Sequence, residues 1–392
     1  MRRLLAALAA STALLSAQTP DAARMKADVY TLASPAFEGR LTGEPGQMKA
    51  ARLVADRFRE LGLQPLGKGP EPFFLPYALQ LRTADERGSV FTLNGHRVPF
   101  GPGAAAFRLA PLETPLCFVP EQVDPGPSVK GRWIARFAPA DPAFDPDAMM
   151  KAALASGATG LLLLPRPGAD TLGSFRDRAR RFILRGRYGF PADGATPSGP
   201  PAAALDEAAA KALGLDLDAL MKASAPRDLG ALSIMPVMTL KTIRPVNVAG
   251  LLPGSDPALK DEIVVLSAHE DHLGMKDGQL HPGADDNASG TAVLMETARL
   301  LKDAKPRRSI LFLSVSGEEL GLFGSRAFVA DPPVPLKSIV ADLNTDMVGR
   351  NGVRAISVTP ARIEGATGTL TRDTRVIASR LGPPRPESRP AP

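Results

Sequence analysis

Residues 263–272 read IVVLSAHEDH, an apolar run that ends in a cluster of ionisable side chains. The run Ile263–Leu266 is continuously apolar, which is typical of a strand buried on both faces. Two similar runs follow at Ile310–Leu313 and Ser338–Leu343, and the apolar residues of Thr291–Leu301 have helical spacing. Alternating strands and helices predict a three-layer α/β fold, in which a mostly parallel sheet has helices on both faces.

Each of these predicted strands is followed by residues that can carry chemistry. His269 ends the first run, Glu318 and Glu319 follow the second, and Asp346 follows the third. Asp286 lies in the Gly-rich segment that opens the helix. Open α/β sheets place their sites beyond the carboxyl ends of the strands. Histidine nitrogens and carboxylate oxygens are zinc ligands, so the sequence predicts a metal site at this edge.

Taken alone, each cluster also has an ordinary structural interpretation. A single histidine after a strand is more often structural than metal-binding, and adjacent glutamates fit a solvated turn. Asp285, Asn287 and Ser289 are good helix N-caps. His269 and His272 are three residues apart on an extended segment, so the helical zinc-protease motif with i, i+4 spacing does not apply. The four clusters together favour a metal site, because all of them fall at strand–helix junctions of one sheet.

The composition is that of a globular protein with many loops. Of 392 residues, 36 are Gly and 39 are Pro, while 44% are hydrophobic and 22% are charged. These values exclude a disordered chain, a collagen and a coiled coil. The net charge of +6 comes without a basic run, so we expect no nucleic-acid partner. The single cysteine, Cys117, excludes an intramolecular disulfide, and its apolar neighbours predict a buried thiol.

The N-terminus has the features of a signal peptide. Met1–Arg3 is basic, and the apolar stretch Leu4–Leu15 is too short to span a bilayer. We expect cleavage after Ala17 and a periplasmic or secreted protein that starts near Gln18, without stable membrane insertion. An uncleaved N-terminal anchor is the alternative.

The character of the sequence changes between residues 113 and 236. Short apolar runs, Trp133–Phe137 and Gly160–Leu164, flank an Ala-rich predicted helix, Ala148–Ser156, and Pro and Gly are frequent. This pattern predicts an inserted α/β domain. The predicted organisation is a signal peptide (1–17), the N-terminal part of the main domain (18–112), the insert (113–236), the core of the main domain (237–350) and an incomplete C-terminal part with a Pro-rich tail (351–392).

Six segments in combination carry a family resemblance. They are ASPAFEGR (33–40), NVAGLLPG (247–254), HEDHLG (269–274), GADDNASG (283–290), EELGLFGS (318–325) and NTDMVGR (344–350). With them the chain resembles metallopeptidase family twenty-eight, the zinc exopeptidases that include bacterial secreted aminopeptidases and glutamate carboxypeptidase II. The insert at 113–236 resembles the protease-associated domain that several members carry at this point. The resemblance implies the zinc-exopeptidase fold and peptide substrates.

The resemblance also implies a set of metal ligands for two zinc ions. His269 and Asp346 would bind one zinc, Glu319 would bind the other, and Asp286 would bridge both. Next to these ligands, Glu318 would be the general base that carries a proton from water to the leaving amine. Asp271 would orient His269 by fixing its tautomer.

One ligand of the family pattern has no counterpart in this sequence, namely a histidine late in the chain that binds the second zinc. The four histidines are His96, His269, His272 and His281. His272 and His281 match no family ligand, and we expect them to be structural or to lie at the rim. Residues 381–392 read LGPPRPESRPAP, so the resemblance implies a truncated C-terminus, with a Pro-rich linker as the alternative. We therefore expect about one firmly bound zinc, low stability and little activity.

The function predicted from these observations is that of an exported zinc-dependent exopeptidase, which hydrolyses N-terminal residues from peptides. Two alternatives stay open. One is a catalytically impaired, truncated peptidase that at most binds peptides. The other is a glutaminyl-cyclase-like zinc acyltransferase on a similar scaffold. The sequence does not fix the oligomeric state or the preferred substrate side chain.

Overall fold

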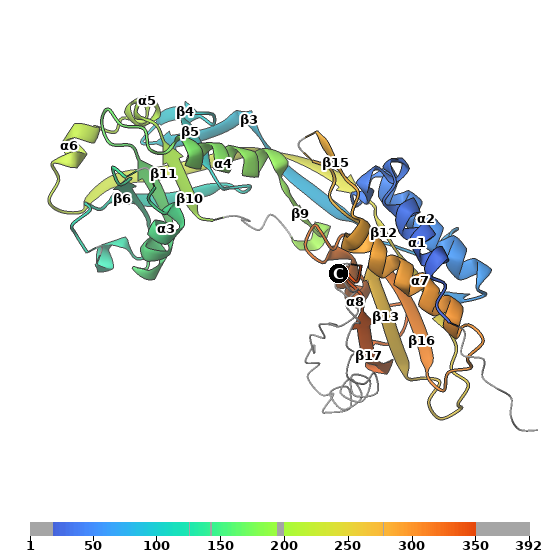
Figure 1. Cartoon of the computed structure of the whole chain (residues 1–392). Helices are drawn as coiled ribbons and strands as arrows, with labels where there is room; N and C mark the ends of the chain where they lie inside the picture. The colour runs from blue at the N-terminus through green and yellow to red at the C-terminus, as the bar shows by residue number, and fades with distance from the viewer. Residues whose placement is uncertain (1–18, 125, 142, 194–199, 277, 350–392) are drawn as a thin grey trace, which may run out of the picture. The chain divides into compact units, whose positions relative to one another are not determined.

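The computed structural model describes residues 19–124, 126–141, 143–193, 200–276 and 278–349 (Figure 1). The predicted signal peptide and the predicted C-terminal part lie outside these residues. The chain divides into two compact units. The discontinuous unit contains the residues up to Tyr77 and those from Arg244 onward, and the inserted unit is Ala78–Ile243.

The discontinuous unit is built on a six-stranded sheet. β13 (Ile263–His269) pairs in parallel with β16 (Ser309–Val315) on one side and with β17 (Ile339–Asn344) on the other. These are the three strands predicted from the apolar runs, and they are confirmed. Because they are parallel, their carboxyl ends lie at the same edge of the sheet.

The other half of this sheet is antiparallel. β12 (Val246–Leu252) runs antiparallel to β16, and it also pairs with β1 (Gln64–Pro65) and β2 (Phe74–Pro76). β12 thus runs opposite to the other described strands of this sheet, which share one direction, as expected for a mostly parallel sheet. The reversal of β12 was not predicted, because an apolar run shows that a strand is buried but not its direction.

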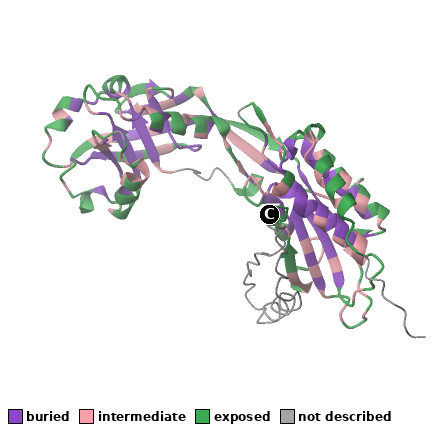
Figure 2. Ribbon diagram, viewed as in Figure 1, coloured by how far each residue is buried: buried purple, intermediate pink, exposed green. Residues whose placement is uncertain are grey.

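Helices pack on both faces of the sheet. One face carries α1 (Ala22–Leu32), α2 (Pro45–Glu60) and α7 (Gly290–Leu301), and the other carries α8 (Phe323–Ala330). α2 buries Ala51, Val54, Ala55 and Phe58, which recur at helical spacing, and its exposed side faces solvent (Figure 2). Shorter elements are η1 (Pro35–Arg40), η4 (Ala284–Ser289), η5 (Leu336–Ser338), β14 (Gly274–Lys276) and β15 (Gln279–His281).

The inserted unit contains a nine-stranded sheet and is wider than the predicted insert at 113–236. The reason is a long antiparallel pair, β3 (Leu79–Leu93) and β11 (Arg227–Ile243), in which Leu79 lies opposite Ile243. β3 contains charged residues such as Arg82, Asp85 and Glu86, yet it is hydrogen-bonded along its length. A strand with one face in solvent can carry such residues.

Parallel strands form the middle of this second sheet. β6 (Leu112–Phe118), β7 (Trp133–Phe137) and β8 (Gly160–Leu164) are neighbours, and α3 (Pro146–Ala155) connects the last two, as predicted. The similarity of this unit to a protease-associated domain stays a prediction. The remaining elements are β4 (His96–Pro99), β5 (Ala104–Ala106), η2 (Pro127–Val129), α4 (Gly173–Arg185), β9 (Arg187–Gly189), η3 (Pro191–Asp193), β10 (Ala202–Leu205), α5 (Glu207–Ala212) and α6 (Leu217–Met221).

The core of the inserted unit is strongly apolar. Phe91, Phe118 and Trp133 are among its fully buried side chains. Cys117 is also buried, as predicted, and burial raises the pKa of its thiol. Among the described helices of the whole chain, none combines the length and the hydropathy needed to cross a lipid bilayer.

Candidate functional site

The residues singled out from the sequence meet at one edge of the discontinuous unit. His269 is the last residue of β13, and Asp346 lies two residues beyond β17. Glu318 and Glu319 follow β16, and Asp286 lies in η4, directly before α7. The parallel pairing of the three strands brings these segments together, although up to 77 residues separate them in the sequence.

A first metal-ligating group consists of His269, Asp286 and Asp346. His269 Nε2 lies 3.4 Å from Asp286 Oδ1 and 3.4 Å from Asp346 Oδ1. The imidazole is almost fully buried, and its Nδ1 lies 3.1 Å from the backbone oxygen of Asp271. A proton on Nδ1 satisfies this contact and leaves the Nε2 lone pair directed at the two carboxylates.

A second group consists of His272, Asp286 and Glu319. His272 Nδ1 lies 2.6 Å from Glu319 Oε1 and 3.9 Å from Asp286 Oδ2. Asp286 is therefore shared, with one oxygen toward each histidine. His272 is predicted to be structural or to lie at the rim, but its side chain is only 10% exposed and faces the carboxylates. Its position three residues after His269 is the signal in the sequence, but this spacing does not show which way the side chain points.

Asp271 links the first group to the neighbouring Glu318. Its carboxylate accepts a hydrogen bond of 2.6 Å from the Thr42 hydroxyl and one of 3.2 Å from the Glu318 backbone N–H. The Thr42 hydroxyl in turn accepts a hydrogen bond from the Gly317 N–H. Thr42, 1% exposed, fixes the turn that carries Glu318, and no motif in the sequence marks it.

Arg40 joins the loops that carry the ligands. Its fully buried guanidinium donates to four backbone oxygens, those of Leu32, Glu270, Pro282 and Gly283, at 2.7–2.8 Å. Burial lowers the pKa of Arg40 to about 10, although four nearby carboxylates oppose this effect. Arg40 is the last residue of the segment ASPAFEGR (33–40), one of the six that carry the family resemblance. The resemblance assigns no role to Arg40, and the structure shows that it joins the ligand loops.

The carboxylates of the site strongly favour a positive charge beside them. Burial acts to lower the pKa of His269, but Asp271, Glu318 and Asp346 outweigh it and raise the value to about 9. Burial raises the pKa of Asp286, and the charge of Glu319 acts in the same direction. Burial likewise raises the pKa of Glu318, against the effect of His269. A bound cation relieves this mutual repulsion of carboxylates.

The donor set fits zinc on a further observation. His272 Nδ1 and Glu319 Oε1 are buried polar atoms without a hydrogen-bond partner among the described residues. Buried polar atoms normally have a partner, and a cation beside both atoms would supply one. Imidazole nitrogens and carboxylate oxygens are ligands that zinc accepts. His269, His272, Asp286, Glu319 and Asp346 can therefore hold zinc.

The helix-cap interpretation of the segment before α7 holds for Asn287, but Ser289 makes no capping hydrogen bond with its side chain and Asp285 contacts a distant part of the chain. Asn287 Oδ1 accepts a hydrogen bond from the Gly290 N–H, and Asp285 Oδ1 accepts one from the Gly349 N–H. Asp286 lies between them and faces the histidines instead. The peptide bond between Asp286 and Asn287 is cis. The segment thus combines one capping contact with a carboxylate that faces both histidines.

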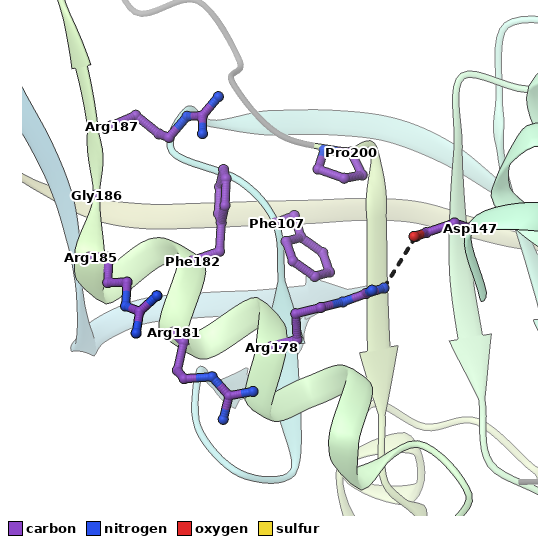
Figure 3. A pocket seen from close by; sticks show the side chains of 9 residues that line it. All are labelled: Phe107, Asp147, Arg178, Arg181, Phe182, Arg185, Gly186, Arg187 and Pro200. Atoms are coloured by element: carbon purple, nitrogen blue, oxygen red, sulfur yellow. Dashed lines mark hydrogen bonds and ion pairs between the residues drawn. The ribbon is translucent and has the colours of Figure 1, made fainter. Parts of the chain in front are cut away.

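A groove of about 470 Å³ lies in the inserted unit, away from these residues in the sequence (Figure 3). Phe107 and Phe182 line it together with four arginines, of which Arg178 pairs with Asp147 at 3.1 Å. The guanidinium groups in Figure 3 point in different directions and do not converge. Both metal-ligating groups found among the described residues lie in the discontinuous unit, so the groove is not the candidate catalytic site.

Part of the chain that contains the site is similar in sequence to known peptidases. Residues 247–387 match peptidase family M28. Aminopeptidase YwaD of Bacillus subtilis is 34% identical over 122 residues, which are 31% of this chain and 26% of that protein. A probable zinc metalloprotease of Leptosphaeria maculans is 32% identical over 143 residues, 33% of each chain. The match thus spans about a quarter to a third of the length of these relatives.

The structure of a zinc aminopeptidase from Bacillus subtilis matches with a TM-score of 0.46 and 20% sequence identity, and the match covers 93% of this chain and 78% of that chain.

Proposed function

The chain is related to peptidase family M28 through residues 247–387, and we propose that it is a zinc-dependent exopeptidase that removes residues from the N-terminus of peptides. The observation that carries this proposal is Asp286, whose two oxygens face the histidines of two metal-ligating groups. Two adjacent groups of metal ligands, with a carboxyl group such as that of Glu318 nearby that binds neither metal, are typical of two-metal hydrolases. When bound, zinc supplies Lewis-acid activation of the peptide carbonyl and of a water molecule.

Glu318 is the residue that we assign to proton transfer. Its Oε2 lies 4.0 Å from His269 Nε2, and it belongs to neither metal-ligating group. The raised pKa of its carboxyl makes Glu318 a better proton acceptor near neutral pH than an ordinary glutamate. Glu318 takes a proton from the attacking water and delivers it to the amine that leaves. The hydrogen bond from its backbone N–H to Asp271 keeps it in reach of the first group.

The direct test is hydrolysis of a synthetic peptide by the full-length chain supplied with zinc. We expect release of the free N-terminal amino acid, no release from the N-acetylated peptide of the same sequence, and loss of turnover when a chelator is added. Internal cleavage or release of the C-terminal residue would contradict the proposed direction of attack.

The same assay separates the alternatives. A peptide with N-terminal glutamine that loses ammonia without releasing an amino acid would favour the glutaminyl-cyclase-like reaction. Zinc binding without turnover of any of these peptides would favour the catalytically impaired peptidase.

We also propose that the chain is exported. The support is the basic start and the apolar stretch within residues 1–17. N-terminal sequencing of the mature protein should find a start near Gln18 in protein from the periplasm or the medium. Protein in the cytoplasm that still begins with Met1 would exclude this proposal.

A further inference from the structure

We propose that His272 is the histidine ligand of the second zinc, so that the sequence HEDH (269–272) supplies one imidazole to each metal position. This inference rests on the proposed zinc site. The family resemblance assigns that role to a histidine further along the chain, and it left this position with Asp286 and Glu319 alone. Zinc sites with three protein ligands are the usual catalytic arrangement, and His272 brings the second group to three.

The geometry around Asp286 carries the proposal. Asp286 Oδ1 lies 3.4 Å from His269 Nε2, and Asp286 Oδ2 lies 3.9 Å from His272 Nδ1. Opposite oxygens of one carboxylate therefore face different imidazoles, as a bridging ligand requires. The third member of the second group, Glu319, places Oε1 2.6 Å from the same His272 nitrogen.

The imidazole of His272 is also held in place before any ion binds. Its backbone N–H donates to the Arg40 oxygen at 3.1 Å. Gly283 packs directly against the ring, because a Cβ at that glycine would lie 2.5 Å from His272 Cγ. Gly283 has a φ of +56°, a left-handed conformation that favours glycine. The chain thus keeps room for this ring next to the carboxylates, which preorganises a ligand.

A simple ion pair between His272 and Glu319 is the competing interpretation. The two atoms are close enough, but their contact lacks hydrogen-bond geometry, and both atoms are buried without a hydrogen-bond partner among the described residues. The 3.9 Å contact between His272 Nδ1 and Asp286 Oδ2 fits either interpretation, so the missing hydrogen-bond geometry at Glu319 is what favours a metal ion. A metal ion accounts for all three atoms at once.

The experiment is a zinc titration of the metal-free, full-length chain by calorimetry, with no peptide present. We expect two zinc equivalents for the wild type. His272→Gln should bind one equivalent as before and the other more than about 100-fold more weakly, which exceeds the usual loss of an outer-shell partner. The matched control is His281→Gln, whose ring centroid lies only 6.5 Å from that of His272 and which should still bind two equivalents. Two unchanged equivalents in a folded His272→Gln chain would overturn the proposal.

A measurement on the wild-type chain keeps the test independent of how the variant folds. The chain has four histidines, so ¹⁵N labelling of histidine gives a small set of imidazole signals. Zinc should shift the ring nitrogens of His269 and His272 and leave those of His96 and His281 in place. A shift of His269 alone would overturn the proposal. Because no substrate is used, the result stands apart from turnover: a chain that binds zinc through His272 but hydrolyses no peptide refutes the proposed function and not this ligand.

Discussion

The two units of the chain bury different kinds of side chain. Apolar side chains such as Phe91, Phe118 and Trp133 dominate the core of the inserted unit, and its few buried polar residues are scattered along the described sequence. The discontinuous unit buries a connected polar cluster around the end of β13. This cluster consists of Arg40, Thr42, His269, Glu270, Asp271 and His272.

The polar cluster costs folding free energy. Glu270 shows this most clearly, because burial raises the pKa of its carboxyl to about 8 even though Ser314 and Gln47 donate hydrogen bonds to it. A buried ionisable group destabilises a fold unless its partners compensate for the lost hydration. Both units have apolar cores, but among the described residues the discontinuous unit also uses part of its interior to support the site. We therefore expect substitutions near the polar cluster to change turnover or zinc binding, and substitutions in the core of the inserted unit to change the free energy of unfolding.

The largest effect should come from Glu318→Gln. The amide cannot accept the proton of the attacking water, so we expect turnover to fall by about 10²–10⁴-fold, the usual size of a general acid–base contribution. Zinc content should not change, because Glu318 belongs to neither metal-ligating group. Steady-state kinetics combined with metal analysis measures both quantities.

Glu319→Gln is the matched comparison for that variant. Glu319 lies in the second group, so its substitution should lower zinc content together with turnover. If Glu318→Gln loses zinc and Glu319→Gln keeps it, the two adjacent glutamates have the opposite roles.

The position of the site could be predicted from the sequence because it depends on local patterns. Apolar runs located β13, β16 and β17, and polar residues at the ends of these strands located His269, Glu318 and Asp346. Parallel strands place such residues at one edge whatever the details of the loops. Strand direction is a different matter, since β12 reads as a buried strand in either orientation.

The supporting residues could not be predicted, because their partners are distant in the sequence. Thr42 contacts Asp271 across 229 residues, and Arg40 contacts Gly283 across 243. His272 faces Glu319 only because the loop after β13 turns back over η1, where its N–H meets the Arg40 oxygen. Spacing along a strand gives no information on such a turn. The same limit applies to β3, whose charged residues conceal a strand that pairs with β11.

In the inserted unit, Phe118→Ala should mainly change stability. Phe118 is 1% exposed and packs edge-on against Phe137, with the ring centroids 5.5 Å apart. Removing a buried phenyl ring leaves a cavity that lowers the free energy of unfolding by about 3–5 kcal/mol, which urea denaturation measures. Zinc binding to the folded protein should stay at the wild-type stoichiometry. The apolar control is Leu240→Ala on β11, which is 57% exposed and should change stability by less than about 0.5 kcal/mol.

Thr42→Val should have an intermediate effect and should act on turnover as well as on stability. The substitution keeps the shape of the side chain but leaves the Gly317 N–H and one Asp271 oxygen without their partner. An unsatisfied buried group costs about 1–3 kcal/mol. If half of this cost raises the activation free energy, because the turn no longer holds Glu318 in place, kcat should fall several-fold to about tenfold while KM stays unchanged.

Two variants check this interpretation of Thr42. Thr42→Ser keeps the hydroxyl and should restore most of the lost turnover. Thr114→Val in the inserted unit removes a buried threonine hydroxyl whose one described contact is a long 3.4 Å hydrogen bond to the adjacent Pro115 oxygen, and it should leave turnover unchanged. Equal losses in Thr42→Val and Thr114→Val would contradict the division of roles between the units.

The smallest effect should come from Asp170→Asn, and it should depend on pH. Arg176, which is nearly buried, donates to both oxygens of Asp170, and this hydrogen bonding lowers the pKa of the carboxyl below its ordinary value of 3.8. Folding therefore favours the charged form, so the pair contributes stability above pH 4, and this contribution is lost as the pH falls through the lowered folded-state pKa. Asp170 is 47% exposed, so solvent screening limits the effect to less than about 1 kcal/mol at pH 7. Urea unfolding of the wild type and of Asp170→Asn at pH 7 and pH 3 should show a difference in unfolding free energy that shrinks toward acid pH.

The control is Asp147→Asn, which removes a more exposed ion pair with Arg178 of the same helix and should lower the unfolding free energy by less at pH 7. A larger loss would mean that burial of the arginine does not set the strength of these pairs.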